Sequence, residues 1–352
     1  MNRTGAGASV QSTVVGRVGL FWPPQKTSFV SAVSLALAQL LIFFLAGCGS
    51  GKDRAPTGTD HGRVLISSLR VDDAENPAGI DNPQPRLSWV LESSERNQGQ
   101  TGRRVLVATA ASLLEPGKAD LWDSGRVESG DSVHVVYGGK TLAARQHCYW
   151  KVRVWDAQNR PSVWSQTGSW EMGLRGEWNA KWIGGGPPRE PRPASGFFKS
   201  QKELSAMGAK VEFDGRSTLL RKSFRVSKPL RQARVYATGL GYYELSCNGR
   251  RVGENVLSPP KSNYRKWVFY DVYDVTKILE SGTNVLGMHL GNGWFNPYPK
   301  WWEPYRMQWF GSKRALVQMH IDYVDGSAEV VVSDDSWITA RGPVLSACVY
   351  DG

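Results

Sequence analysis

Short runs of alternating apolar and polar residues, separated by turn residues, make up the sequence from residue 64 onward. In the run CYWKVRVW at 148–155, Trp150, Val152 and Val154 occupy every second position. A period of two residues gives one apolar face and one mixed face, as a strand of a β-sandwich requires. Long runs with the 3.6-residue period of an amphipathic helix are absent. The pattern therefore predicts an all-β protein.

Composition excludes some classes of protein. Apolar residues make up 41% of the chain and charged residues 21%, which is typical of a globular protein rather than a disordered one. The net charge is +11, but the positive residues are dispersed or occur in isolated pairs. Without a basic stripe or a recognised motif, the charge favours a solvated surface and gives no support to a nucleic-acid partner.

Residues 1–47 have the pattern of a secretory signal peptide. A basic region precedes the apolar run FVSAVSLALAQLLIFFL at 29–45, and Leu-Ala-Gly stands directly before Cys48. That last motif resembles the bacterial lipobox, which implies cleavage before Cys48, a diacylglyceryl group on its thiol, and attachment to a membrane of the cell envelope. The alternative is an uncleaved transmembrane helix, although the apolar run is slightly shorter than the roughly 20 residues that a span needs. The leader before Phe29 is unusually long, so a later start codon is a further alternative.

Residues 48–62 are rich in Gly, Ser, Pro and Thr and are expected to form a flexible tether. The other three cysteines, Cys148, Cys247 and Cys348, are far apart and lack metal spacing. Cys148 and Cys247 fall in strand-like runs and are interpreted as small buried hydrophobes. A disulfide between them is the alternative in an oxidising compartment.

Two domains are expected, at 63–174 and 175–352. The first should contain strands at 64–71, 86–91, 104–109, 133–137, 148–155 and 163–172, with a longer connection at 112–123 that includes one helical turn. The second should begin with an irregular stretch at 185–217 and continue with strands at 219–226, 232–238, 242–247, 267–274, 284–290, 315–323 and 328–332. Asn248-Gly249 predicts a tight turn that joins two strands.

Several motifs resemble known modules. NPQPRLSW at 82–89, LWDSG at 121–125 and YWKVRVWD at 149–156 resemble the fibronectin-III-like module that opens many bacterial α-L-rhamnosidases. GLGYYEL at 239–245, YDVT at 273–276 and LGNGWF at 290–295 resemble the N-terminal domain of the same glycoside hydrolases of family 78. The resemblance implies a fibronectin-III/Ig-like β-sandwich followed by a jelly-roll-like (galactose-binding-like) β-sandwich.

The resemblance also implies a function. Family members hydrolyse terminal α-L-rhamnose by inversion, with catalytic carboxylates on an (α/α)6 barrel that follows these modules. The ending at 342–352 resembles the stretch just before the second sandwich completes its last strands. We therefore expect an accessory part, inactive alone, without assignable catalytic residues. A frameshifted, split or incompletely sequenced gene, or a separately encoded catalytic domain, would account for it.

Independent catalytic motifs are absent. The five histidines lack metal spacing, and neither G-x-S-x-G nor a Walker A loop occurs. The pairs Asp72-Asp73 and Asp334-Asp335 are interpreted as turn carboxylates rather than as a catalytic pair.

The alternative function is a stand-alone surface lipoprotein that binds rhamnose or another carbohydrate. The loop GNGWFNPYPKWWEPYRMQWF at 291–310 is dense in aromatic rings, and sugar binding needs an aromatic face with fixed polar groups nearby. The candidate carbohydrate-binding residues are Asn292, Trp294, Trp301 and Trp302. The competing interpretation is that these rings pack against the sandwich or the catalytic barrel.

Calcium is the cofactor that the resemblance allows, because relatives of the second sandwich are sometimes calcium-dependent rhamnose-binding modules. Glu254 and Asn255 are the candidate ligands, with solvated turn residues as the alternative.

In the first domain, Trp122 and Trp164 suggest either sugar stacking or anchors in the core and between strands, and the second interpretation is favoured.

Overall fold

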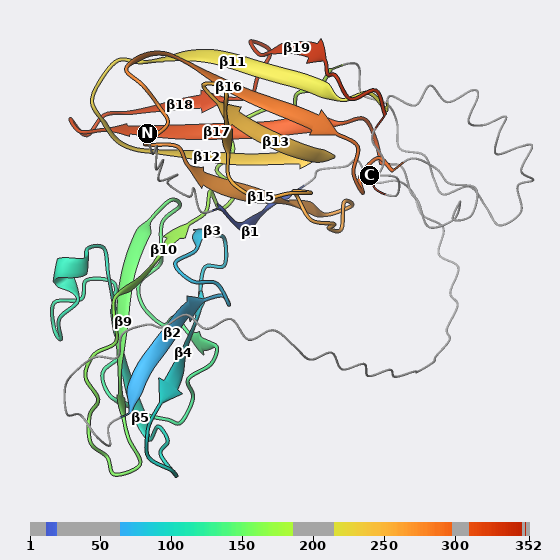
Figure 1. Cartoon of the computed structure of the whole chain (residues 1–352). Helices are drawn as coiled ribbons and strands as arrows, with labels where there is room; N and C mark the ends of the chain where they lie inside the picture. Colours follow the sequence, from blue (N-terminus) through green and yellow to red (C-terminus); the bar gives the residue numbers. More distant parts are fainter. Residues whose placement is uncertain (1–11, 20–63, 186–214, 298–309, 347–348, 350–352) are drawn as a thin grey trace, which may run out of the picture.

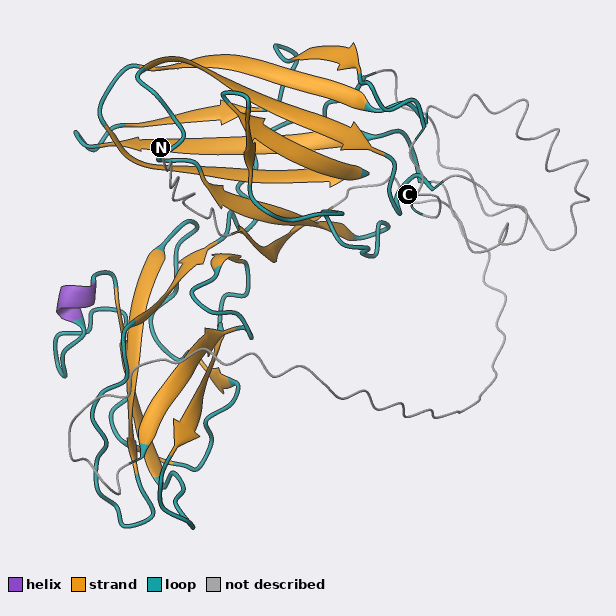
Figure 2. Ribbon diagram, viewed as in Figure 1, coloured by secondary structure: helices purple, strands orange, loops and turns teal. Residues whose placement is uncertain are grey.

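The computed structural model describes residues 12–19, 64–185, 215–297, 310–346 and 349. Figure 1 shows two domains built from strands, one below the other, joined near β3, β10 and β15. Apart from the 3-10 turn Ala111–Leu113, the described chain is strand or loop (Figure 2). The all-β prediction is confirmed.

The first domain is a sandwich of two sheets. One sheet has the strand order β3-β10-β9-β5-β6, with β7 also paired to β5, and the other has the order β2-β4-β8. The core between them contains Trp89, Trp150 and Trp170, each at most 2% exposed. The strands are β2 Leu65–Val71, β3 Ala78–Ile80, β4 Arg86–Glu92, β5 Gly102–Ala108, β6 Trp122–Asp123, β7 Val127–Glu128, β8 Val135–Val136, β9 His147–Trp155 and β10 Gly168–Met172.

Strand β9 shows why the sequence forms this sheet. Its even-numbered residues are buried and its odd-numbered residues are half-buried, as the alternating run predicted. The 3-10 turn Ala111–Leu113 lies at the start of the predicted helical connection.

Cys148 on β9 and Cys247 in the second domain are both buried and free. The alternative of a disulfide between them is wrong, because each sulfur lies in the core of a separate domain.

The predicted strand at 163–172 begins later than expected, at Gly168. The reason is local hydrogen bonding by serine. The amides of Val152 and Val154 on β9 donate to the hydroxyls of Ser165 and Ser162, at 3.1 and 3.2 Å. Side-chain oxygens therefore take positions that backbone carbonyls would occupy in a regular ladder.

The second domain is also a two-sheet sandwich. Its sheets have the orders β1-β15-β12-β17-β18 and β14-β13-β16-β11-β19, and every pair is antiparallel. The strands are β1 Ser12–Gly19, β11 Thr218–Val226, β12 Leu230–Leu240, β13 Tyr242–Cys247, β14 Arg250–Val252, β15 Trp267–Asp274, β16 Gly282–Gly291, β17 Arg314–Tyr323, β18 Ala328–Val332 and β19 Ile338–Arg341. Leu245, Leu286 and Met288 from one sheet pack with Val235, Val317 and Ile321 from the other.

The predicted Asn248-Gly249 turn joins β13 to β14. The two residues have φ angles of 51° and 75°, which is the pair of left-handed conformations that a type I′ hairpin turn requires. The short strands β3, β6, β7 and β19 were not predicted as strands, and β14 was implied only as the second strand that the turn joins. Nor was β1, which lies inside the predicted signal peptide at 1–47; that signal peptide stays a prediction.

The two sandwiches meet around the side chain of Tyr270. Its hydroxyl donates to Asp81 Oδ1 at 2.8 Å and accepts from the amide of Leu174 at 3.1 Å, and both partners belong to the first domain or its exit. The Trp178 ring meets the Tyr270 ring edge-on, with centroids 5.3 Å apart. Tyr270 is fully buried, so its contacts with Asp81, Leu174 and Trp178 belong to the core of the junction.

Two ion pairs flank Tyr270 across the same junction. Arg234 on β12 donates to Glu171 on β10 at 2.9 Å, and Arg145 donates to Asp322 on β17 at 2.7 Å. Glu171 and Asp322 are both less than 10% exposed. Buried charges of this kind are tolerated only when each has its partner, so the pairs fix one orientation of the domains.

We predict that Tyr270→Phe destabilises the protein by roughly 1–3 kcal/mol, because Asp81 and the Leu174 amide lose a buried hydrogen-bond partner. Urea unfolding of the full chain measures this change. Tyr149→Phe, on the half-buried outer face of β9, is the matched control and should shift stability by less than about 0.5 kcal/mol. Equal shifts for the two variants would contradict the role of the Tyr270 hydroxyl.

Candidate functional site

The start of the aromatic loop is a packed turn at the end of β16. Phe295 is 2% exposed and its ring lies 5.4 Å from Tyr264 and 5.7 Å from Phe310, centroid to centroid. Asn296 accepts from the amide of Gly293 at 2.8 Å and donates to the carbonyl of Leu240 at 3.2 Å. These contacts close the turn against β12 and hold the entry to the loop in place.

Two of the four candidate carbohydrate-binding residues lie in this turn. Asn292 is 5% exposed, and its Oδ1 accepts a hydrogen bond from the buried Lys313 ammonium at 2.9 Å. Trp294 is half-buried, and the Lys261 ammonium lies 4.5 Å from its ring centroid. The other two candidates, Trp301 and Trp302, lie outside the described residues.

Lys313 and Lys261 were missed by sequence reasoning. Both come from distant segments, one directly before β17 and the other in the connection before β15, and nothing in their local sequence marks them. Their two ammonium groups give this turn a cationic character beside its aromatic rings. The carbohydrate-binding assignment itself stays a prediction.

The candidate calcium ligands lie in the connection between β14 and β15. Glu254 is exposed, whereas Asn255 donates from Nδ2 to Asp271 Oδ1 at 3.0 Å. The backbone carbonyl of Asn255 accepts from Arg251 at 2.9 Å. Asn255 therefore uses its amide to tie the connection to β15. In the part of the chain that the structure describes, no three His, Cys, Asp or Glu side chains gather as a metal site.

Asp271 is a fully buried carboxylate held by neutral donors. Its Oδ2 accepts from the hydroxyls of Tyr243, Ser258 and Tyr273, with the Tyr243 contact at 2.5 Å and the Tyr273 contact at 3.2 Å. Burial raises the pKa of Asp271, although these hydrogen bonds favour its charged form. The cluster is a structural anchor for the 253–264 connection.

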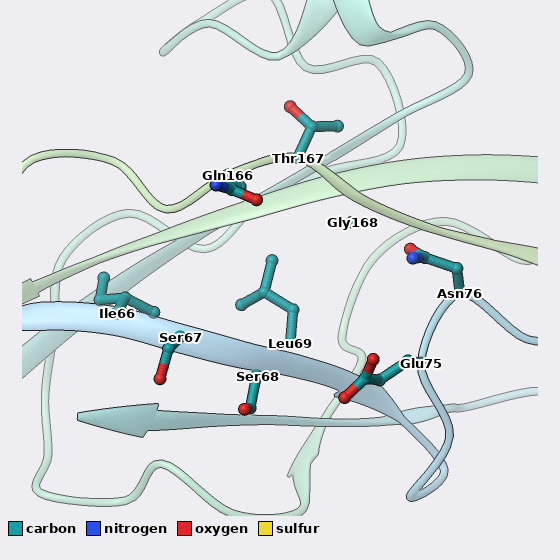
Figure 3. Close-up of a pocket in the computed structure, with 9 residues that line it drawn as sticks. All are labelled: Ile66, Ser67, Ser68, Leu69, Glu75, Asn76, Gln166, Thr167 and Gly168. Atoms are coloured by element: carbon teal, nitrogen blue, oxygen red, sulfur yellow. The ribbon is translucent and has the colours of Figure 1, made fainter. Parts of the chain in front are cut away.

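A pocket of about 330 Å³ lies in the first domain, and Figure 3 shows its lining. Strand β2 forms one wall, and the segment 166–168 lies opposite it. The volume is at the small end of ligand sites. Among the described residues that line it, Glu75 is the one carboxylate and none is aromatic; Arg70 lies 3.9 Å from Glu75. The pocket supplies polar groups without the stacking face that a sugar ring favours.

The two tryptophans of the first domain act as anchors. Trp122 packs edge-on against Tyr137, with centroids 5.4 Å apart, beside the core. Trp164 receives Lys151 and Arg153 from β9 over its ring, at 5.0 and 4.6 Å from the centroid. Both rings therefore pack against neighbouring strands, in agreement with the interpretation of them as anchors in the core and between strands.

Cys48, the candidate lipid attachment site, lies outside the described residues. Within the described ranges, no helix is long and apolar enough to cross a membrane.

Comparison with protein families assigns both domains. Residues 66–176 match the Rha78A-like, N-terminal immunoglobulin domain, and residues 228–352 match the alpha-L-rhamnosidase N-terminal domain. The chain contains the N-terminal modules of the α-L-rhamnosidases. The predicted family and the predicted order of the two sandwiches are therefore confirmed.

Individual α-L-rhamnosidases show how much of such a protein these modules represent. A relative from Formosa agariphila is 34% identical over 320 residues, which is 89% of this chain and 33% of the relative. The structure of the enzyme from Dictyoglumus thermophilum has a TM-score of 0.68 at 34% identity, over 82% of this chain and 31% of that one. A Streptomyces avermitilis α-L-rhamnosidase complexed with L-rhamnose, 24% identical over 82% of this chain and 42% of that one, shares the fold with a TM-score of 0.70. The chain thus spans about a third of the length of the curated relatives that it matches.

We predict that Asp271 makes the stability of this rhamnosidase module depend on pH. Because its pKa is raised, the folded state binds a proton at Asp271 more tightly than the unfolded chain does. That contribution is complete below the ordinary value of 3.8 and is lost as the pH rises through the raised pKa. Between pH 4 and 7, wild type should lose stability relative to Asp271→Asn, by up to about 1.4 kcal/mol for each unit by which the pKa is raised.

Denaturant unfolding at pH 4, 5, 6 and 7 measures this difference, with Asp274→Asn on the same strand as the control. Burial tends to raise the pKa of Asp274, but hydrogen bonds from Thr276 and the charge of Arg234 outweigh it and lower the pKa. Its contribution is lost only as the pH falls below about 3.8, so the gap between that variant and wild type should stay constant from pH 4 to 7. A constant gap for Asp271→Asn would contradict the prediction.

Proposed function

We propose that this chain is the non-catalytic N-terminal accessory part of an α-L-rhamnosidase and is inactive by itself. In the full-length enzyme, the reaction is hydrolysis of terminal α-L-rhamnose from glycans or glycosides. The observation that carries the proposal is the order of the two modules, which together account for most of the described chain while spanning about a third of the relatives.

The state of the buried carboxylates supports inactivity. An inverting glycosidase needs two carboxyl groups about 6.5–9.5 Å apart, with a water and a sugar between them. The buried acidic residues of the described chain are Asp156, Glu171, Asp271 and Asp322. Three of them are bound to arginines, and the fourth, Asp271, is enclosed by hydroxyls and an amide. All four hold structure together instead of facing a shared cleft.

The proposed role is that of a rigid support. The junction around Tyr270 and its two flanking ion pairs joins the sandwiches into one unit. A support of this kind positions a catalytic domain, encoded in the same protein or separately, relative to its point of attachment. Rhamnose-containing glycan is then the partner of the complete enzyme.

We predict that the purified 352-residue chain leaves an aryl α-L-rhamnoside uncleaved. The reason is that the paired acid and base of the reaction are not supplied by these modules. Release of the aryl group is followed by absorbance, with the full-length Formosa agariphila relative as the positive control. Turnover above the buffer blank that persists through repeated purification would refute the proposal.

We also propose that Cys48 carries a lipid and attaches the protein to the cell envelope. An acyl chain gains about 0.8 kcal/mol for each buried methylene, so the anchor depends on this one thiol. Cys48→Ser should abolish incorporation of labelled palmitate and move the protein out of the membrane fraction. Cys348→Ser is the matched control and should leave both unchanged; labelling that survives Cys48→Ser would contradict the proposal.

A further inference from the structure

The segment that leads out of the first domain is tied to β17 by one glutamine. Gln318 is fully buried, and its Oε1 accepts a hydrogen bond from the amide of Asn179 at 2.7 Å. Its Nε2 donates to the carbonyl of Glu177 at 3.0 Å. Because one partner is a donor and the other an acceptor, only one orientation of the side-chain amide satisfies both. This side chain therefore holds residues 177–179 against β17.

His320, two residues later on β17, depends on that orientation. Its Nε2 lies 2.8 Å from Nε2 of Gln318. The amide nitrogen of Gln318 carries two hydrogens, and since one of them points to Glu177, the other is directed at His320. The imidazole nitrogen must accept it, so the ring is neutral and carries its hydrogen on Nδ1. A proton on Nε2 would place two donors within hydrogen-bond distance of each other.

Two groups of opposite charge lie near His320. Asp322, also on β17, is paired with Arg145 of the first domain at 2.7 Å. Burial and the charge of Arg145 lower the pKa of His320 to about 4, whereas the charge of Asp322 acts in the opposite direction. The surroundings of the ring therefore favour its neutral form, in agreement with its hydrogen bond.

The neighbouring strand β12 connects His320 to the junction. Arg234 lies opposite His320 in the register, and its guanidinium pairs with Glu171 and Asp274. The ring of Tyr236 meets the imidazole edge-on, with centroids 5.9 Å apart, and the Tyr236 hydroxyl donates to Glu171 at 3.4 Å. On the other side, β18 places an uncharged valine opposite His320. His320 thus lies directly beside the contacts that join the two domains.

We propose that His320 is an acid-sensitive latch between the two sandwiches. When neutral, its ring accepts the hydrogen bond from Gln318, which keeps residues 177–179 on β17. When the ring takes a proton from solvent, Nε2 becomes a donor, and either the ring or the Gln318 amide has to turn away. The segment that leads out of the first domain is then released, and the junction loosens. The latch acts on the junction alone and requires no catalytic domain.

The direction of the effect follows from the lowered pKa of His320. A released ring regains an ordinary pKa near 6.5, so the open junction binds a proton more tightly than the closed one. The closed junction is therefore most favoured above about pH 6.5, and this preference decreases as the pH falls toward 4. The two values limit the change in the opening equilibrium to about 300-fold, and water that reaches the half-buried ring reduces it.

Hydrogen exchange of the full chain at pH 6.5, 5.5 and 4.5 tests the latch. Exchange in peptides that cover 175–183 is corrected for the intrinsic rate at each pH and expressed as a protection factor. Wild type should lose protection there by roughly tenfold or more. His320→Gln should keep it within about twofold, because a glutamine oxygen can accept from Gln318 without titrating. His289→Gln, on β16 in the other sheet, is the matched control and should behave as wild type does.

The comparison isolates the histidine. The ion pairs of Glu171 and Asp322 are present in all three proteins, so any weakening of these pairs by acid is common to them. A loss of protection in His320→Gln as large as in wild type overturns the proposal, and so does constant protection in wild type. Protection of β13 peptides in the same samples shows that the second sandwich stays folded.

The hydrogen on the ring provides a second measurement, which needs no opening of the junction. In the chain labelled with nitrogen-15 at histidine, the ring signals that are missing from His320→Gln belong to His320. At pH 7, its Nδ1 should have the chemical shift of an N–H and its Nε2 that of a nitrogen without hydrogen. A ring that carries hydrogen on Nε2 at this pH overturns the proposal, whatever the exchange rates are.

Discussion

The packing of Tyr270 is the constraint on which the rest of the structure depends. Its ring is too large to share space with Cβ atoms, so glycines stand where the chain passes close to it, at 16 and 173. Its hydroxyl reaches Asp81 and Leu174 on the other side of the junction. Because Tyr270 and Leu174 are fully buried, a change in the angle between the domains would leave their polar groups without partners, at about 1–3 kcal/mol each.

Local pattern was enough to predict the strands but not their partners. Alternation in the run at 148–155 predicted β9, and the Asn248-Gly249 dipeptide predicted the turn between β13 and β14. Both predictions succeeded because each effect depends on neighbouring residues alone. The late start of β10 depends on serine hydroxyls that bond across to β9, which a period-two pattern does not reveal. Short strands such as β3 and β19 depend on long-range pairing, since three or four residues carry too little pattern.

At the candidate site, too, the local sequence indicated individual residues but not the distant residues that they contact. Sequence reasoning made Asn292 a candidate carbohydrate-binding residue and Asn255 a candidate calcium ligand, and in the structure both side chains are hydrogen-bonded within the protein. Their partners, Lys313 and Asp271, are distant in sequence, and sequence alone could not show that they take up the polar groups of these residues. An asparagine that stands out in a sequence motif can therefore fix a turn as well as bind a ligand.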